Sequence, residues 1–124
     1  MRILLAIGAG GFLGAIARYL MQLITVKWLP LAFPYGTLIV NVVGCFLIGI
    51  FYGLADRGNM QSPEWKFFLT TGFCGGFTTF STFSYEVYTL WKLDHTFYFS
   101  LYIGLSLTLS ILATFLAISL VRSI

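Results

Sequence analysis

Four long stretches of hydrophobic residues follow one another along this chain, separated by short segments rich in prolines, charged residues and glycine. They cover approximately residues 3–26, 35–55, 65–91 and 96–121. A helix crosses the hydrocarbon core of a bilayer with about 20 mostly apolar residues, so each stretch is long enough to span it. Short connections make consecutive helices antiparallel neighbours. The pattern predicts an all-α membrane protein with one domain, residues 1–124, built from four transmembrane helices.

The composition agrees with this pattern and excludes a water-soluble fold. Of the 124 residues, 59% are hydrophobic and 9% are charged, whereas soluble domains carry about 25% charged residues. The net charge of +3 comes from basic residues scattered at helix ends, which predicts no nucleic-acid partner. Cys45 and Cys74 lie inside predicted spans and His95 stands alone in a loop, so we expect neither a disulfide framework nor a metal cluster.

The first stretch has one alternative interpretation, as a cleaved signal peptide. Arg2, an apolar run and the small residues Ala15 and Ala17 imitate that pattern. However, apolar sequence continues to Val26 and three further spans follow. A retained helix is the favoured interpretation.

The basic residues give almost no orientation bias across the membrane. In the predicted topology, Arg2, Arg57, Lys66 and Arg122 lie toward one face, and Lys27, Lys92 and Arg18 lie toward the other. Orientation normally follows an excess of Lys and Arg on the cytoplasmic side. The near balance leaves two explanations open: insertion in both orientations, which would permit an antiparallel dimer, or a small bias that suffices in the cell.

The fourth stretch carries hydroxyl groups at every fourth position, on one slowly drifting helical face. They are Tyr102, Ser106, Ser110 and Thr114. At 1.5 Å per residue they extend over roughly 18 Å, more than half of the hydrocarbon thickness. Such a ladder is typical either of a path for a polar solute or of hydrogen bonds that hold helices together. Four groups in register favour the path.

Other polar residues also lie at membrane depth. Thr37 and Asn41 share a face of the second stretch, and the Asn41 amide offers donors to a passing anion. Glu86 is an intramembrane acid and therefore a candidate functional residue. Arg18 either reaches toward the interface or supplies positive potential near a vestibule.

The third stretch contains weak helix-forming sequence in its middle. Gly75-Gly76 is followed by Thr78-Thr79, which predicts a helix broken mid-membrane. Such a break is tolerated where the freed backbone groups meet protein, water or an ion, and freed carbonyls suit a hard cation such as sodium. Glycine pairs elsewhere, Gly10 with Gly14 and Gly49 with Gly53, predict close helix packing.

Two phenylalanines follow the predicted break. Phe80 and Phe83 are three residues apart, so their rings lie near one another on a helical face. Aromatic rings have a positive edge, which an anion could meet. Plain packing is the common role of two phenylalanines at this spacing and stays open as the alternative.

Three motifs resemble a known family. They are GFCGGFTTFSTFSYE at 72–86, GGFLGAIARY at 10–19 and GTLIVNVVGCFLIG at 36–49. Together they resemble the small bacterial fluoride channels of the Fluc (CrcB) family, over nearly the full length. The resemblance implies a multi-pass protein of the bacterial inner membrane that exports fluoride passively as an antiparallel, dual-topology homodimer with two pores.

The resemblance also implies roles for individual residues. A structural sodium ion at the dimer interface would be held by backbone carbonyls of Gly75 and Thr78. Phe80 and Phe83 would present ring edges to fluoride, Asn41 would be the pore asparagine, and Arg18 would line the vestibule. The implied polar track consists of Thr37, Ser81, Thr82, Tyr102, Ser106, Ser110 and Thr114, with Glu86 beside it.

Three other classes fit less well. A small multidrug exporter requires a carboxylate deep in the first helix, where this chain has Arg18 and no acid. A structural subunit would leave the broken helix and the hydroxyl ladder as unrelated coincidences. An intramembrane enzyme lacks a Ser/His, paired-Asp or metal constellation, so the sequence predicts that the protein is not an enzyme.

Overall fold

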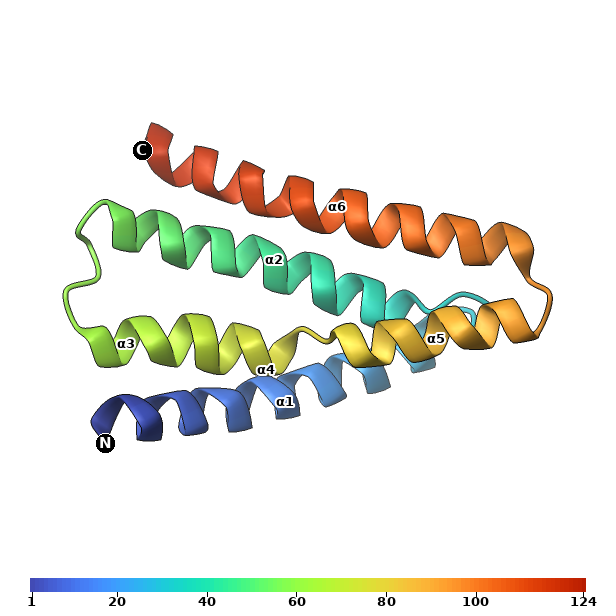
Figure 1. Ribbon diagram of the computed structural model, residues 1–124, viewed down its shortest axis with the longest axis horizontal. Coiled ribbons are helices and arrows are strands. Elements are labelled where there is room, and N and C mark those ends of the chain that lie inside the picture. The colour runs from blue at the N-terminus through green and yellow to red at the C-terminus, as the bar shows by residue number, and fades with distance from the viewer.

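The computed structural model describes all 124 residues and consists of helices joined by short loops, with no β-strand. Three continuous helices are α1 (Arg2–Trp28), α2 (Tyr35–Asp56) and α6 (Thr96–Ser123). Between α2 and α6 lies a rod of four pieces: α3 (Pro63–Phe67), the π-helix η1 (Phe68–Cys74), α4 (Gly75–Phe77) and α5 (Phe80–Lys92). Consecutive rods run antiparallel, and both termini lie at one end of the bundle (Figure 1). The predicted all-helical architecture is confirmed.

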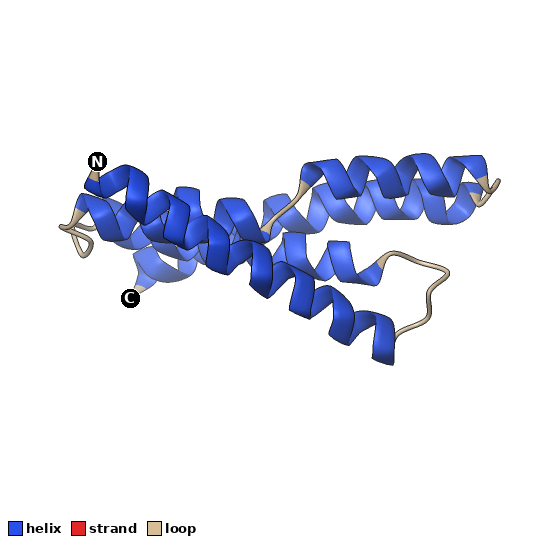
Figure 2. Cartoon of the chain, turned by 90° about the horizontal axis from the view of Figure 1, so that it is seen from below, coloured by secondary structure: helices blue, strands red, loops and turns tan.

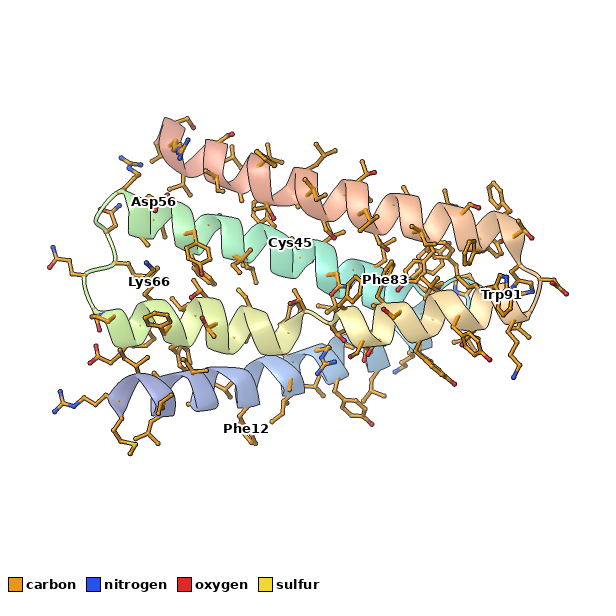
Figure 3. The ribbon with its side chains drawn as sticks, in the orientation of Figure 1. Phe12, Cys45, Asp56, Lys66, Phe83 and Trp91 are labelled. Atoms are coloured by element: carbon orange, nitrogen blue, oxygen red, sulfur yellow. The ribbon has the colours of Figure 1, made fainter.

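The outer surface of the bundle is apolar. Helices α1, α2 and α6 are each long and apolar enough to cross a membrane. Phe12 on α1 and Phe115 on α6 expose 67% and 68% of their surface, and Figure 3 shows Phe12 pointing away from the neighbouring helices. Lipid tails solvate such side chains, whereas every backbone polar group must find a partner within a helix or across the bundle.

The helix ends are fixed by local polar contacts. The Arg57 guanidinium Nη1 donates to the Val121 carbonyl O at 2.6 Å, and it therefore satisfies a carbonyl in the last turn of α6. Gly58 follows with a φ of +75°, a left-handed conformation that suits glycine. Figure 3 shows Asp56 and Lys66 at the end that carries the termini and Trp91 at the opposite end. Charged and aromatic residues at both ends match the two interfaces of a bilayer.

Helix α1 packs against η1 and α4 through glycines. A Cβ atom added at Gly10 or Gly14 of α1 would overlap the backbone of the third rod. The contact is mutual, because a Cβ at Gly72 would lie 2.8 Å from the Ile7 carbonyl O, and one at Gly76 would lie 2.5 Å from the Gly11 carbonyl O. The expected close packing at Gly10 and Gly14 is confirmed.

Helices α2 and α6 form a second glycine-mediated contact. A Cβ at Gly49 would lie 2.7 Å from the Ala117 Cβ, and one at Gly53 would lie 3.1 Å from the Val121 Cβ. Small residues let the two helices approach closely, where dispersion contacts replace the absent hydrophobic driving force. The predicted role of Gly49 and Gly53 is therefore also confirmed.

Two extended residues separate α4 from α5. Thr78 has φ −78° and ψ 156°, and Thr79 has φ −150° and ψ 121°, both in the β region. Of the two weak pairs that the sequence predicted, Gly75 and Gly76 are helical, and Gly76 serves the contact with α1. The interruption thus lies at the threonines, while the paired glycines serve packing.

The bundle opens at the end opposite to the termini. Here the pair α5 and α6 diverges from the pair α1 and α2 (Figure 2). An apolar cluster joins the α1–α2 loop and α2 to α5 and α6, and its buried members are Phe33, Leu38, Phe83, Leu90 and Tyr102. The Phe33 ring meets the Tyr102 ring edge-on, with centroids 5.5 Å apart. Polar side chains also lie between the two pairs of helices, since Thr37 of α2 donates a hydrogen bond to Glu86 of α5.

Candidate functional site

The side chain of Asn41 on α2 clamps the extended segment of the third rod. Its Nδ2 donates to the Thr79 carbonyl O at 3.0 Å, and its Oδ1 accepts from the Thr79 backbone N at 2.8 Å. A side-chain amide has a donor and an acceptor on one edge, so Asn41 replaces the helical partners that Thr79 lacks. One N–H of Asn41 remains for another acceptor. Its predicted role as a pore donor stays a prediction.

The hydroxyl of Thr79 gathers the polar groups at the start of α5. Its Oγ1 accepts from the Thr82 backbone N at 3.2 Å, which is an N-cap of the helix. The same oxygen lies 3.3 Å from Ser81 Oγ and donates to Thr82 Oγ1 at 3.2 Å. Sequence reasoning placed Ser81 and Thr82 in the polar track and named Thr79 only as part of the weak helix-forming sequence. The position of Thr79 directly before a predicted helix was a usable signal, because threonine is a common N-cap residue.

The helix interruption releases backbone carbonyls from their helical hydrogen-bond partners. Thr78 N and Thr78 Oγ1 both donate to the Cys74 carbonyl O at 2.9 Å. No hydrogen bond reaches the Thr78 carbonyl O, and Thr79 N, which would bond to the Gly75 carbonyl O in a continuous helix, donates to Asn41 Oδ1 instead. Uncharged carbonyl oxygens are ligands for hard cations. Gly75 and Thr78, the predicted sodium ligands, therefore have the donor chemistry for that ion, and the predicted sodium stays a prediction.

A cavity of about 230 Å³ lies beside the interruption. Asn41, Thr78, Phe80, Phe83, Ser106 and Ser110 contribute to its lining. The Ser106 Oγ is buried and has no hydrogen-bond partner. Buried hydroxyls in apolar surroundings normally find a partner, so a donor without one, in the wall of a cavity, suits a transient polar guest.

The last member of the predicted ladder has a different environment. Thr114 Oγ1 donates to the Cys45 carbonyl O on α2 at 3.1 Å and lies 3.2 Å from the Ser110 carbonyl O. These are bonds between and within helices. The structure thus gives the hydroxyls two settings: Ser106 faces the cavity, and Thr114 joins α6 to α2.

The two predicted phenylalanines lie together but in different surroundings. Their ring centroids are 5.5 Å apart with planes tilted by 46°. Phe80 exposes 74% of its surface in the single chain, whereas Phe83 exposes 8% and contacts the Tyr102 ring at 5.1 Å. Phe83 is therefore part of the bundle core, and Phe80 is available to a neighbouring molecule.

Glu86 on α5 is held by hydroxyls from two other helices. Thr37 Oγ1 on α2 donates to Glu86 Oε1 at 2.7 Å, and the Tyr102 hydroxyl on α6 donates to Glu86 Oε2 at 2.6 Å. Thr37 and Tyr102 are almost fully buried. Each carboxylate oxygen has a donor, which is the requirement for an acid at membrane depth. The structure brings together three residues that the sequence placed on three separate helices.

A larger cavity of about 540 Å³ opens next to this cluster, between α1, the α1–α2 loop and α5. Thr37, Glu86 and His95 contribute to its wall. Gln22 of α1 also lines it and donates from Nε2 to Thr37 Oγ1 at 3.3 Å. Sequence reasoning missed Gln22, although an amide within an apolar span was a usable signal.

Arg18 lies one helical turn before Gln22 and is half-buried. Its Nε is buried without a hydrogen-bond partner. A guanidinium is always protonated in proteins, so it places a positive charge within this helix. The location agrees with the hypothesis of positive potential near a vestibule, and that role stays a prediction.

These observations define a class of protein. Three membrane-length helices, a third rod interrupted at Thr78 and Thr79, and polar residues around two cavities describe a multi-pass membrane protein with polar groups inside the bundle. The described residues contain no cluster of three or more His, Cys, Asp or Glu side chains that could bind a metal.

The chain belongs to the family described as CrcB-like protein, Camphor Resistance (CrcB), which it matches over residues 5–118. It is 50% identical over 103 residues to a protein of Leptospira interrogans, covering 83% of this chain and 81% of that one. It is 41% identical to a protein of Flavobacterium psychrophilum over all 124 residues of both chains. A protein of Chlorobium phaeobacteroides is 44% identical over 119 residues, covering 96% of this chain and 92% of the relative.

Each of these three relatives is named fluoride-specific ion channel FluC. The family is thus one of ion channels, and the expectation that the protein is not an enzyme is confirmed.

Proposed function

We propose that this chain is a fluoride-selective channel that lets F⁻ leave the cytoplasm passively. The observation that carries the proposal is the match, over the full length, to a relative named for fluoride specificity. Two features of the chain support it. Hydroxyl and amide groups surround the cavity beside the interruption, and Ser106 Oγ there has no partner within the chain.

Selectivity would follow from the chemistry of these donors. Fluoride is small and strongly hydrated, so a narrow path must replace its water with other hydrogen-bond donors. The Ser106 hydroxyl and the uncommitted N–H of Asn41 supply donors, and the positive edges of Phe80 and Phe83 supply weaker contacts. A larger halide accepts weaker hydrogen bonds and fits a narrow path poorly. Several modest contacts also allow release, which conduction requires.

We propose further that two copies assemble antiparallel in the membrane, with two pores along their interface. The exposed Phe80 ring supports this, because a second copy could complete the surroundings that the single chain leaves open. The nearly balanced basic residues at the two membrane faces favour insertion in both orientations. The proposed interface contains the interrupted third rod, which would lie mid-membrane.

A structural sodium ion is proposed at the centre of this dimer. The carbonyls of Gly75 and Thr78, which lack their helical partners at the interruption, fit a hard cation, and a second copy would double their number. The ion would hold the two interruptions together and supply positive potential near the pores. Removal of sodium from purified protein, with potassium or a large organic cation as replacement, should then shift the dimer toward monomer on size-exclusion chromatography.

The direction of transport would follow from acid–base chemistry. Hydrogen fluoride crosses bilayers as a neutral weak acid and dissociates in neutral cytoplasm, where F⁻ accumulates. A passive pore in the bacterial inner membrane would let the anion leave down its electrochemical gradient and reduce fluoride toxicity. No cofactor beyond the structural sodium and no covalent step is required.

Ion efflux from liposomes that carry the purified protein tests the proposal. A fluoride electrode should record rapid loss of fluoride, while matched chloride-loaded liposomes lose negligible chloride. Protein-free liposomes are the background control. Absence of fluoride loss from protein that is folded and inserted would refute the channel function, and equal loss of chloride would refute the selectivity.

The proposed dual topology has a separate test. A single cysteine introduced at Asn59 in the α2–α3 loop, in a background without Cys45 and Cys74, reports the side on which the loop lies. A membrane-impermeant thiol reagent should label about half of the population from outside intact vesicles. Complete labelling, or none, would show one fixed orientation and contradict the antiparallel dimer.

A further inference from the structure

Gln22 ends a chain of hydrogen bonds that links all four rods of the bundle. Its Nε2 on α1 donates to Thr37 Oγ1 on α2 at 3.3 Å, and Thr37 Oγ1 donates to Glu86 Oε1 on α5 at 2.7 Å. Tyr102 on α6 donates to the other Glu86 oxygen at 2.6 Å. No other side-chain hydrogen bond joins α1 to the rest of the bundle.

The direction of this chain is fixed by hydrogen count. A threonine hydroxyl has one hydrogen, and here it goes to Glu86, so the Thr37 oxygen has only lone pairs to offer to α1. A group on α1 must therefore be a donor, and the amide N–H of Gln22 is one. The neighbouring Thr25 cannot replace it, because its Oγ1 faces the Met21 and Gln22 carbonyl oxygens at 3.1 and 2.9 Å.

We propose that Gln22 is a positioning residue of the fluoride path, which keeps the Thr37 hydroxyl on Glu86 and thereby holds the carboxylate away from the passing anion. This inference rests on the proposed function. With both oxygens occupied by hydroxyls, Glu86 is tied to α2 and α6 at the wall of the 540 Å³ cavity. If Thr37 were free to rotate, Oε1 would lose its donor, and the carboxylate could turn into the cavity and repel fluoride.

Fluoride efflux in a double-mutant cycle tests this assignment, with the single variants Gln22→Met and Thr37→Val and their combination. Methionine keeps the length of glutamine and has no N–H. Loss of one hydrogen bond of ordinary strength corresponds to about a fivefold change, so Gln22→Met should lower the fluoride efflux rate by about that factor. Because Gln22 acts through Thr37, Gln22→Met should cause no further loss in the Thr37→Val background.

A merely structural role predicts a different result. A packing defect at Gln22 would lower efflux by the same factor in both backgrounds, since it does not need the Thr37 hydroxyl. Equal losses in both backgrounds, or wild-type efflux by Gln22→Met, would overturn the proposal. Leu23→Met, at an exposed position on the same helix, is the matched control and should keep wild-type efflux.

The outcomes separate this inference from the function on which it rests. Wild-type protein without fluoride efflux would defeat both. Fluoride-selective wild-type efflux combined with additive variants would defeat only the role of Gln22. If Gln22→Met does not yield folded protein, Gln22→Leu carries the cycle, because leucine also lacks a donor and adds no charge to the cavity wall, and the same two results decide.

Discussion

The two halves of the third rod pack in opposite ways. The half formed by η1 and α4 approaches α1 through backbone, at positions such as Gly14 and Gly76 where a Cβ atom has no room. The half formed by α5 contacts its surroundings through side chains, with the apolar Phe83 and Leu90 in the core cluster and Glu86 bonded to α2 and α6. The first half sets the distance between helices, and the second half carries the polar side chains that form hydrogen bonds inside the bundle. The two halves meet at Thr78 and Thr79, so the close contact of the first half with α1 lies directly beside the interruption.

The largest expected effect comes from disrupting the close contact between α4 and α1. Gly76→Leu places a side chain against the backbone of Gly11 and Ala15, where neither helix can yield without moving the rod. Overpacking costs about 1–3 kcal/mol or more, and we expect little folded protein on size-exclusion chromatography in detergent. Gly8→Leu on α1, where an added Cβ meets no atom within 4 Å, is the matched control and should yield folded protein. Equal yields from both variants would show that the close approach is dispensable.

The second prediction concerns the junction. Asn41→Asp replaces the Nδ2 donor to the Thr79 carbonyl by an oxygen and adds a negative charge beside the 230 Å³ cavity. An unsatisfied carbonyl in the membrane costs several kcal/mol, so the melting temperature should fall, and fluoride efflux should be nearly abolished. Thermal unfolding followed by circular dichroism measures the first effect, and the fluoride electrode measures the second. Unimpeded efflux would remove Asn41 from the path, whatever its effect on stability.

A smaller effect is expected within the polar half. Tyr102→Phe removes one hydroxyl and leaves the ring that packs on Phe33 and Phe83. A hydrogen bond to a charged group contributes about 1.5–3 kcal/mol, and its loss should lower fluoride efflux by a factor of roughly ten to one hundred while the protein elutes as before. Tyr98→Phe, one turn earlier on α6 at a position without a side-chain hydrogen bond, serves as the control. Efflux at the wild-type rate would mean that the Tyr102 hydroxyl is structural only.

The smallest expected effect separates the two phenylalanines. Phe80→Ile changes an exposed ring and should leave thermal stability of the single chain unchanged, whereas Phe83→Ile removes a buried ring from the core. If both rings meet fluoride, efflux falls in both variants by about three- to tenfold, the range that corresponds to aromatic contact energies. Wild-type efflux in either variant would discard that ring. The comparison of melting temperature with efflux keeps packing apart from conduction.

The pattern of apolar residues was sufficient to predict the helices, because lipid leaves a chain few other ways to satisfy its backbone. Four apolar stretches and their proline and charge boundaries predicted the all-helical bundle, and Gly10, Gly14, Gly49 and Gly53 predicted its close contacts. The family, too, was recognisable from the motif at 72–86. These features are local or periodic in the sequence, so they can be recognised without knowing the tertiary structure.

Only the tertiary structure shows where the third rod is interrupted and which groups the polar side chains contact. The sequence placed two weak pairs next to each other, Gly75-Gly76 and Thr78-Thr79. The glycines are helical and pack against α1, and the interruption falls at the threonines, where Asn41 bonds to Thr79. Nothing in the spacing joins Gln22, Thr37, Glu86 and Tyr102, which lie on four different rods. A hydrogen bond forms only between groups that packing brings within about 3 Å, and packing is a property of the folded bundle.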